Sequence, residues 1–218
     1  MHRVLTDHGA LREFTQSLGE GIAKHANEIQ QRTGAPVIVQ LDEPSLPTVL
    51  AGALRTPSGL GTVAAVAEPE ARDTLHAVIQ AAKNATGQPV IVHCCATRPP
   101  VALLRQAEAD AIALDATILD GAPAALADEI GEAWDAGTVF LLGTVPSTDP
   151  ATPLTLAAAA APALRLVDRL GFPRTLLAER ALPTTACGLA GATSDWAKRA
   201  LSLVRDLGRA FVEPPESW

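Results

Sequence analysis

The stretch Pro89-Val90-Ile91-Val92-His93-Cys94-Cys95 decides the fold of this chain and the place of its chemistry. The apolar run at its start predicts a β-strand. Residues i and i+2 of a strand lie on the same face, so His93 and Cys95 are placed to bind one ion together. Cys94 points to the opposite face and is expected to pack among apolar side chains, as free cysteines usually do.

A metal site needs more than this pair, because a histidine and a cysteine on one buried strand are more often packed than ligating. The third cysteine, Cys187, lies far downstream in Thr184-Thr185-Ala186-Cys187-Gly188-Leu189. One histidine, two thiolates and one further oxygen or nitrogen ligand make a tetrahedral zinc site. His93, Cys95 and Cys187 are therefore candidate zinc ligands.

The composition is that of a globular protein. Its 218 residues are enough for one domain with a sizeable core, and a single domain is expected over residues 1–218. Because 48% of the residues are hydrophobic but only 3% are aromatic, this core should consist of Ala, Leu and Val. The formal charge is -7 and no cluster of Lys or Arg occurs, so neither nucleic acid nor an anionic membrane is an expected partner. No apolar run suits a membrane span, and three cysteines without a disulfide framework indicate a cytoplasmic protein.

Helical and strand patterns alternate along the chain. A helix is predicted where apolar residues step by three or four from Leu11 to Ile29, with Gly34 and Pro36 as its stop. Another is predicted from Glu68 to about Gly87. Further helices rich in Ala, Leu and Glu fill the remaining gaps, the last at residues 193–211. Short apolar runs typical of strands lie at residues 37–41, 89–95, 111–115, 138–142 and 181–185.

Apolar strands separated by helices indicate an α/β fold in which helices cover a parallel sheet. Polar residues follow the strands: Asp42, His93 with Cys95, Asp115 and Cys187 all lie at or just beyond a carboxyl end. Enzymes of the (β/α) TIM-barrel type assemble their sites at that end, which favours a barrel. A closed barrel of this type has eight strands, and the pattern here supplies five.

The motifs as a set resemble one family. Asp42-Glu43-Pro44, His93-x-Cys95, Asp115 after its apolar strand, and Cys187-Gly188-Leu189 occur in the order found in the carboxy-terminal catalytic barrel of cobalamin-independent methionine synthase. The resemblance extends from about Thr6 to Phe211. It implies a methionine synthase/uroporphyrinogen decarboxylase-like barrel that is truncated at its amino terminus, so that the last five of eight strands remain.

The resemblance also implies roles for single residues. Zinc is held by His93, Cys95 and Cys187, with Asp115 in the place where the family usually has Glu. Aspartate is one methylene shorter, so the backbone must bring this carboxylate closer to the ion. Asp42 matches the acid that contacts the amino group of the substrate homocysteine.

The implied reaction transfers a methyl group from a 5-methyltetrahydrofolate polyglutamate to the thiol of homocysteine and yields methionine. Such a thiol, with a pKa near 8.5, is mostly protonated at neutral pH. Coordination to zinc deprotonates it and holds the sulfur as the nucleophile. The chain is thus expected to be a zinc-dependent methyltransferase of methionine biosynthesis.

One stretch departs from the family pattern. The family has a histidine followed by serine shortly after the strand that corresponds to residues 138–142, and this histidine is thought to donate a proton. Here the stretch reads Gly143-Thr144-Val145-Pro146-Ser147-Thr148-Asp149. No catalytic proton donor is therefore assigned, and a corrinoid protein is kept as an alternative methyl donor because it lessens the need for such an acid.

Other interpretations stay open beside this one. Asp42 could end a strand in a turn, and Asp115 could cap the turn that follows its strand. The chain could be a non-catalytic, zinc-binding partial barrel whose open sheet edge is covered by a second copy or by another partner. A relative in the uroporphyrinogen decarboxylase superfamily is a third interpretation, against which the His-x-Cys motif and Cys187 argue.

Overall fold

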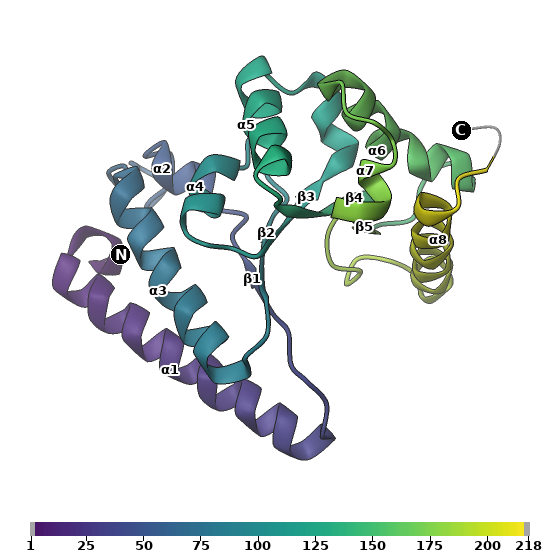
Figure 1. Ribbon diagram of the computed structural model, residues 1–218. Coiled ribbons are helices and arrows are strands. Elements are labelled where there is room, and N and C mark those ends of the chain that lie inside the picture. Colours follow the sequence, from purple (N-terminus) through teal and green to yellow (C-terminus); the bar gives the residue numbers. More distant parts are fainter. Residues whose placement is uncertain (1–2, 216–218) are drawn as a thin grey trace. The chain divides into compact units, whose positions relative to one another are not determined.

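The computed structural model describes residues 3–215, and helices alternate with strands along them (Figure 1). The elements in chain order are η1 (Arg3–Thr6), α1 (His8–Thr33), β1 (Val39–Asp42), α2 (Leu46–Leu50), α3 (Glu68–Thr86), β2 (Val90–Cys94), α4 (Val101–Gln106), β3 (Ala111–Asp115), η2 (Ala116–Gly121), α5 (Ala124–Asp135), β4 (Val139–Val145), α6 (Leu156–Leu170), α7 (Leu176–Arg180), β5 (Ala181–Thr185) and α8 (Ser194–Val212). The five strands form one parallel sheet in the order β1-β2-β3-β4-β5. This confirms the predicted α/β fold and agrees with part of a TIM-type barrel.

The described part of the chain forms two compact units, residues 3–93 with 100–111 and residues 94–99 with 112–215. A single domain over residues 1–218 stays a prediction. No helix within residues 3–215 is both long and apolar enough to cross a membrane.

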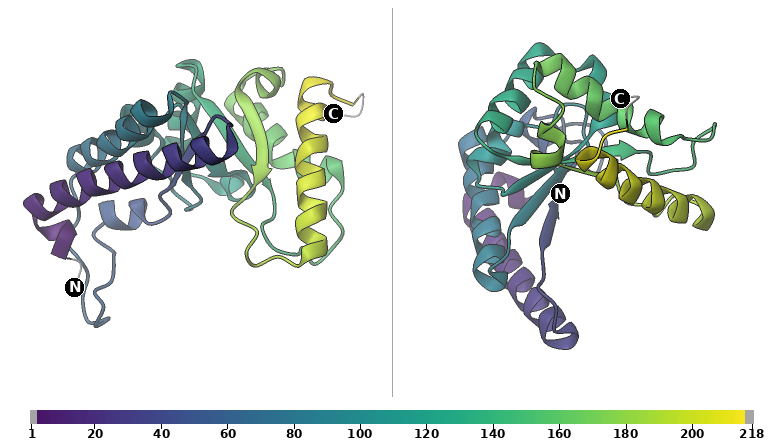
Figure 2. Two further views of the ribbon diagram at one scale, coloured as in Figure 1. Left: turned by 90° about the horizontal axis from the view of Figure 1, so that it is seen from below. Right: turned by 45° about the vertical axis from the view of Figure 1, so that its right-hand side comes forward.

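In the first unit, α1 and α3 run side by side, as both views of Figure 2 show. The carboxylate of Asp7 accepts a hydrogen bond of 3.0 Å from Ala10 N and so caps the start of α1. Gly34 ends α1 with φ at 69°, a left-handed conformation that suits glycine. Gly87 ends α3 in the same way, with φ at 63°. Both predicted helix ends are thus confirmed.

Strand β2 is the strand that the opening stretch predicts. Val90, Val92 and Cys94 are completely buried, and His93 on the other face is 8% exposed. Cys95 follows the strand directly and is half-buried. The complete burial of Cys94 confirms that this side chain packs in the core, as the sequence predicts.

In the second unit, β4 pairs in parallel with β5, and an irregularity in register falls between Gly143 and Val145. Helix α5 packs its Trp134 edge-on against Phe140 of β4, with ring centroids 5.3 Å apart. Strand β4 runs on to Val145, beyond the predicted end at residue 142. The carbonyl oxygen of Val145, the last residue of β4, accepts a hydrogen bond of 2.8 Å from Ala186 N.

Candidate metal centre

The candidate site residues lie at or just beyond the carboxyl ends of strands, as the sequence predicts. Asp42 is the last residue of β1, His93 lies near the end of β2 and Asp115 is the last residue of β3. Cys187 follows the end of β5 at Thr185. Each of these residues therefore lies at or near the carboxyl end of its strand, the end at which barrel enzymes place their chemistry.

Asp42 and His93 form the first contact of the site. They are directly paired in the register of β1 and β2, and Asp42 Oδ1 lies 3.0 Å from His93 Nδ1. Gln40 Nε2 donates a hydrogen bond of 2.9 Å to the same carboxylate oxygen. A carboxylate at Nδ1 fixes the orientation of an imidazole ring, which is the usual arrangement behind a metal-bound histidine.

Cys95 and Cys187 form the second contact, through a hydrogen bond between their thiols. Burial raises the pKa of the Cys95 thiol above its ordinary value, and the adjacent Cys187 raises this pKa further. The negative charge of Asp115 acts in the same direction. Two thiols this close resist ionising together, and a bound cation would remove that cost.

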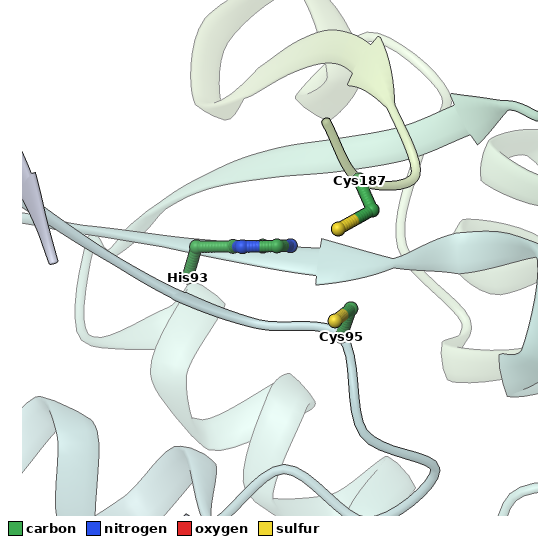
Figure 3. A group of neighbouring side chains, drawn as sticks. All are labelled: His93, Cys95 and Cys187. Carbon is green, nitrogen blue, oxygen red and sulfur yellow. The ribbon is translucent and has the colours of Figure 1, made fainter. Parts of the chain in front are cut away.

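His93, Cys95 and Cys187 each offer one ligand atom, and these three atoms lie within 4.8 Å of one another. Figure 3 shows the His93 ring and both thiols turned toward a common point. An imidazole nitrogen and two thiolates are ligands that zinc prefers. The donor set therefore fits the predicted ion.

Asp115 caps the turn after its strand, which is one of the two roles that the sequence allows for it. Its Oδ1 accepts hydrogen bonds from Thr117 N at 2.9 Å and from Thr117 Oγ1 at 2.6 Å, which caps η2. Asp115 is not a member of the group of three ligand atoms found among residues 3–215. Its role as a zinc ligand stays a prediction, and so does the contact of Asp42 with a substrate amino group.

A cavity of about 560 Å³ lies within the first unit. Its walls are mostly apolar, with Phe14 and Leu18 of α1 among them, and Asp42 and Glu43 also line it. Burial raises the pKa of the Glu43 carboxyl, and the charge of Asp42 raises it further. Two acids beside an apolar wall suit an apolar body that carries an amine.

The stretch 143–149, which departs from the family pattern, has a structural role at Gly143 that the sequence did not predict. A Cβ on Gly143 would lie 2.6 Å from Ala186 Cα and 2.9 Å from Leu114 O. Only glycine lets the backbone before Cys187 pass this close to β4. A glycine at the end of an apolar run is too common a signal to reveal such a contact.

A family model described as "Cobalamin-independent synthase, Catalytic domain" matches residues 3–210. No curated protein matches the chain. The matched residues include Asp42, His93, Cys95, Asp115 and Cys187.

Proposed function

The chain belongs to the family of cobalamin-independent synthase catalytic domains, and we propose that it is a zinc-dependent methyltransferase that methylates the thiol of homocysteine to give methionine. The methyl donor that we propose is a 5-methyltetrahydrofolate polyglutamate. The convergence of His93, Cys95 and Cys187 in a member of this family is the observation that carries the proposal.

The proposed ligands are the His93 imidazole, the Cys95 and Cys187 thiolates and the Asp115 carboxylate. Zinc, when bound, would hold the homocysteine sulfur as a thiolate at neutral pH. Asp42 accepts the Nδ1 proton of His93 in a hydrogen bond, so Nε2 is the nitrogen that we assign to the metal. The same acid, which lines the cavity in the first unit, is proposed to bind the substrate amino group.

The overall transfer forms a sulfur–methyl bond and breaks the bond between the methyl group and N5 of the folate. The thiol proton of homocysteine ends on N5, so the leaving amine is neutral. A corrinoid protein is a second candidate donor, which the lack of a histidine in the stretch 143–149 favours. In transfer from a corrinoid, the methyl–cobalt bond would break, cobalt would keep the electron pair, and the thiol proton would go to water.

A non-catalytic role is the remaining alternative. Strands β1 and β5 are the two edges of the sheet, and an edge strand offers backbone groups to another chain. In this alternative the chain binds zinc and a second copy or another partner covers an edge. We propose a cytoplasmic location for either role, with neither nucleic acid nor membrane as a partner.

The experiment that tests the proposed function is a measurement of zinc in the purified chain by mass spectrometry. The same sample is then titrated with homocysteine while proton release is followed. About one zinc per chain and release of a proton on binding are the expected results. Zinc that is indifferent to homocysteine would favour the non-catalytic alternative, and a chain that cannot bind zinc would contradict both.

A methyl-transfer assay then separates the donors. The zinc-loaded chain is incubated with homocysteine and either 5-methyltetrahydrofolate triglutamate or methylcobalamin, which serves as the corrinoid probe. Methionine from the folate alone supports the first donor, and methionine from methylcobalamin alone supports the second. The Cys94→Ala variant is the control for mutation of a cysteine outside the ligand set, and Cys95→Ala is the variant expected to be inactive.

A further inference from the structure

Cys187 is exposed, in a loop between β5 and α8, and it needs a fixed backbone to act as a ligand. We infer that Asp149 is a positioning residue for Cys187, because its carboxylate anchors the far end of that loop at Thr193. The inference rests on the proposed zinc site and adds to it a residue that touches neither metal nor substrate.

Both carboxylate oxygens of Asp149 bind Thr193, 44 positions along the chain. Oδ1 accepts a hydrogen bond of 2.5 Å from Thr193 Oγ1, and Oδ2 accepts one of 2.8 Å from Thr193 N. A hydroxyl can donate one hydrogen bond and still accept others. Thr193 Oγ1 accepts from Trp196 N at 3.2 Å and so caps α8.

A second contact joins the same two segments. Trp196 is 8% exposed, and its Nε1 donates a hydrogen bond of 3.1 Å to Pro146 O. A Cβ on Gly191 would lie 3.4 Å from Thr148 Cγ2, so the loop passes close to this segment. Residues 146–149 therefore contact both the loop and the first turn of α8.

The near end of the loop is held by strand contacts. Ala186 N donates to Val145 O at 2.8 Å, and Thr185 Oγ1 donates to Cys187 O at 2.9 Å. Cys187 thus lies between an anchor at Ala186 and an anchor at Thr193. The strand pairing provides the first, and Asp149 provides the second through a side chain that is itself exposed.

The Asp149 anchor differs from an ordinary surface ion pair in what it connects. Asp168 is an exposed acid of the same unit, and it binds Arg174 through Arg174 Nε at 3.0 Å and Nη2 at 2.6 Å. That pair joins α6 to the segment before α7, and neither segment carries a proposed ligand. Asp168→Ala is therefore a matched control for the loss of a doubly hydrogen-bonded carboxylate.

The test compares Asp149→Ala, Asp149→Asn and Asp168→Ala in three measurements. The first is zinc affinity by competition with a chelator, and the second is the sulfur-to-metal absorption of the cobalt-loaded chain, which reports the number of bound thiolates. The third is the rate at which iodoacetamide alkylates Cys187 in the metal-free chain, followed by mass mapping. Thermal melts record any general loss of stability.

We expect Asp149→Ala to lower zinc affinity about tenfold, to weaken the cobalt–thiolate band and to speed alkylation of Cys187. Asp149→Asn keeps one acceptor and should recover part of each effect. Asp168→Ala should alter the melting temperature alone. Wild-type zinc affinity, cobalt spectrum and alkylation rate in Asp149→Ala would overturn the inference. A wild-type chain without zinc affinity would instead overturn the proposed function, and the alkylation rates would still decide the role of Asp149.

Discussion

Asp42 and His93 are directly opposite each other in the register of β1 and β2, and their side chains meet at 3.0 Å. Strand pairing alone thus brings a carboxylate to the ring of a proposed zinc ligand. The same pairing holds the backbone behind them, since Glu43 N donates to His93 O at 2.7 Å. Asp42 is therefore placed to orient His93, in addition to the substrate contact that the family resemblance implies.

Replacement of Asp42 by Asn should weaken zinc binding roughly 10- to 100-fold, because the amide is a poorer acceptor for the His93 Nδ1 proton. Competition with a chelator measures this. Asp73→Asn is the control, since Asp73 is an exposed acid of the same unit that binds its neighbour Arg72. If zinc affinity is unchanged and homocysteine binds more weakly, Asp42 serves the substrate alone.

Mutation of each cysteine should distinguish the two proposed zinc ligands from Cys94. Cys95→Ala and Cys187→Ala each remove a thiolate and should abolish tight zinc binding, as metal content by mass spectrometry will record. Cys94→Ala should keep its zinc, and because Cys94 is completely buried it should lose about 1 kcal/mol of stability. Equal metal content in all three variants would contradict the proposed site.

Asp115 can be tested as a ligand apart from its role as a cap. Asn caps helices about as well as Asp, so Asp115→Asn should leave the melting temperature of the metal-free chain unchanged. The loss of the anionic oxygen should still weaken zinc binding. Asp115→Ala should bind zinc more weakly and should also lose about 1 kcal/mol of stability, because the cap of η2 is removed. Wild-type zinc affinity in Asp115→Asn would leave Asp115 as a cap alone.

The sequence predicted the sheet well because each strand is a short apolar run bounded by turn residues. Strands β3 and β5 have the predicted bounds. The grouping of His93, Cys95 and Cys187 was predictable because periodicity in a strand and position after a strand are local properties. The contact of Asp42 with His93 and the anchor at Asp149 depend on pairing between segments far apart in sequence, which no local pattern reveals.

Gly143 should not tolerate a side chain. A Cβ there would lie 2.6 Å from Ala186 Cα, and the backbone cannot yield without moving the residue before Cys187. We expect Gly143→Ala to cost about 1–3 kcal/mol and to lower zinc affinity, measured by thermal melts and chelator competition. Gly121→Ala is the control, since nothing lies within 4 Å of a Cβ at that position. Equal behaviour of the two variants would show that Ala186 can shift freely.

The Asp149 anchor should weaken in acid. Hydrogen bonds from Thr193 Oγ1 and N hold the pKa of the Asp149 carboxyl below its ordinary value of 3.8. A lowered folded-state pKa stabilises the protein above the unfolded-state pKa, and this contribution is lost as pH falls through the folded-state pKa. The melting temperatures of the wild type and Asp149→Asn should therefore differ most near neutral pH and converge below about pH 4.

The control is Asp168→Asn, whose melting temperature should converge with that of the wild type in the same way, since Arg174 lowers the pKa of Asp168. Only Asp149→Asn should alter alkylation of Cys187. A melting difference for Asp149→Asn that stays constant from pH 7 to pH 3 would mean that the ionised carboxylate is not what holds Thr193.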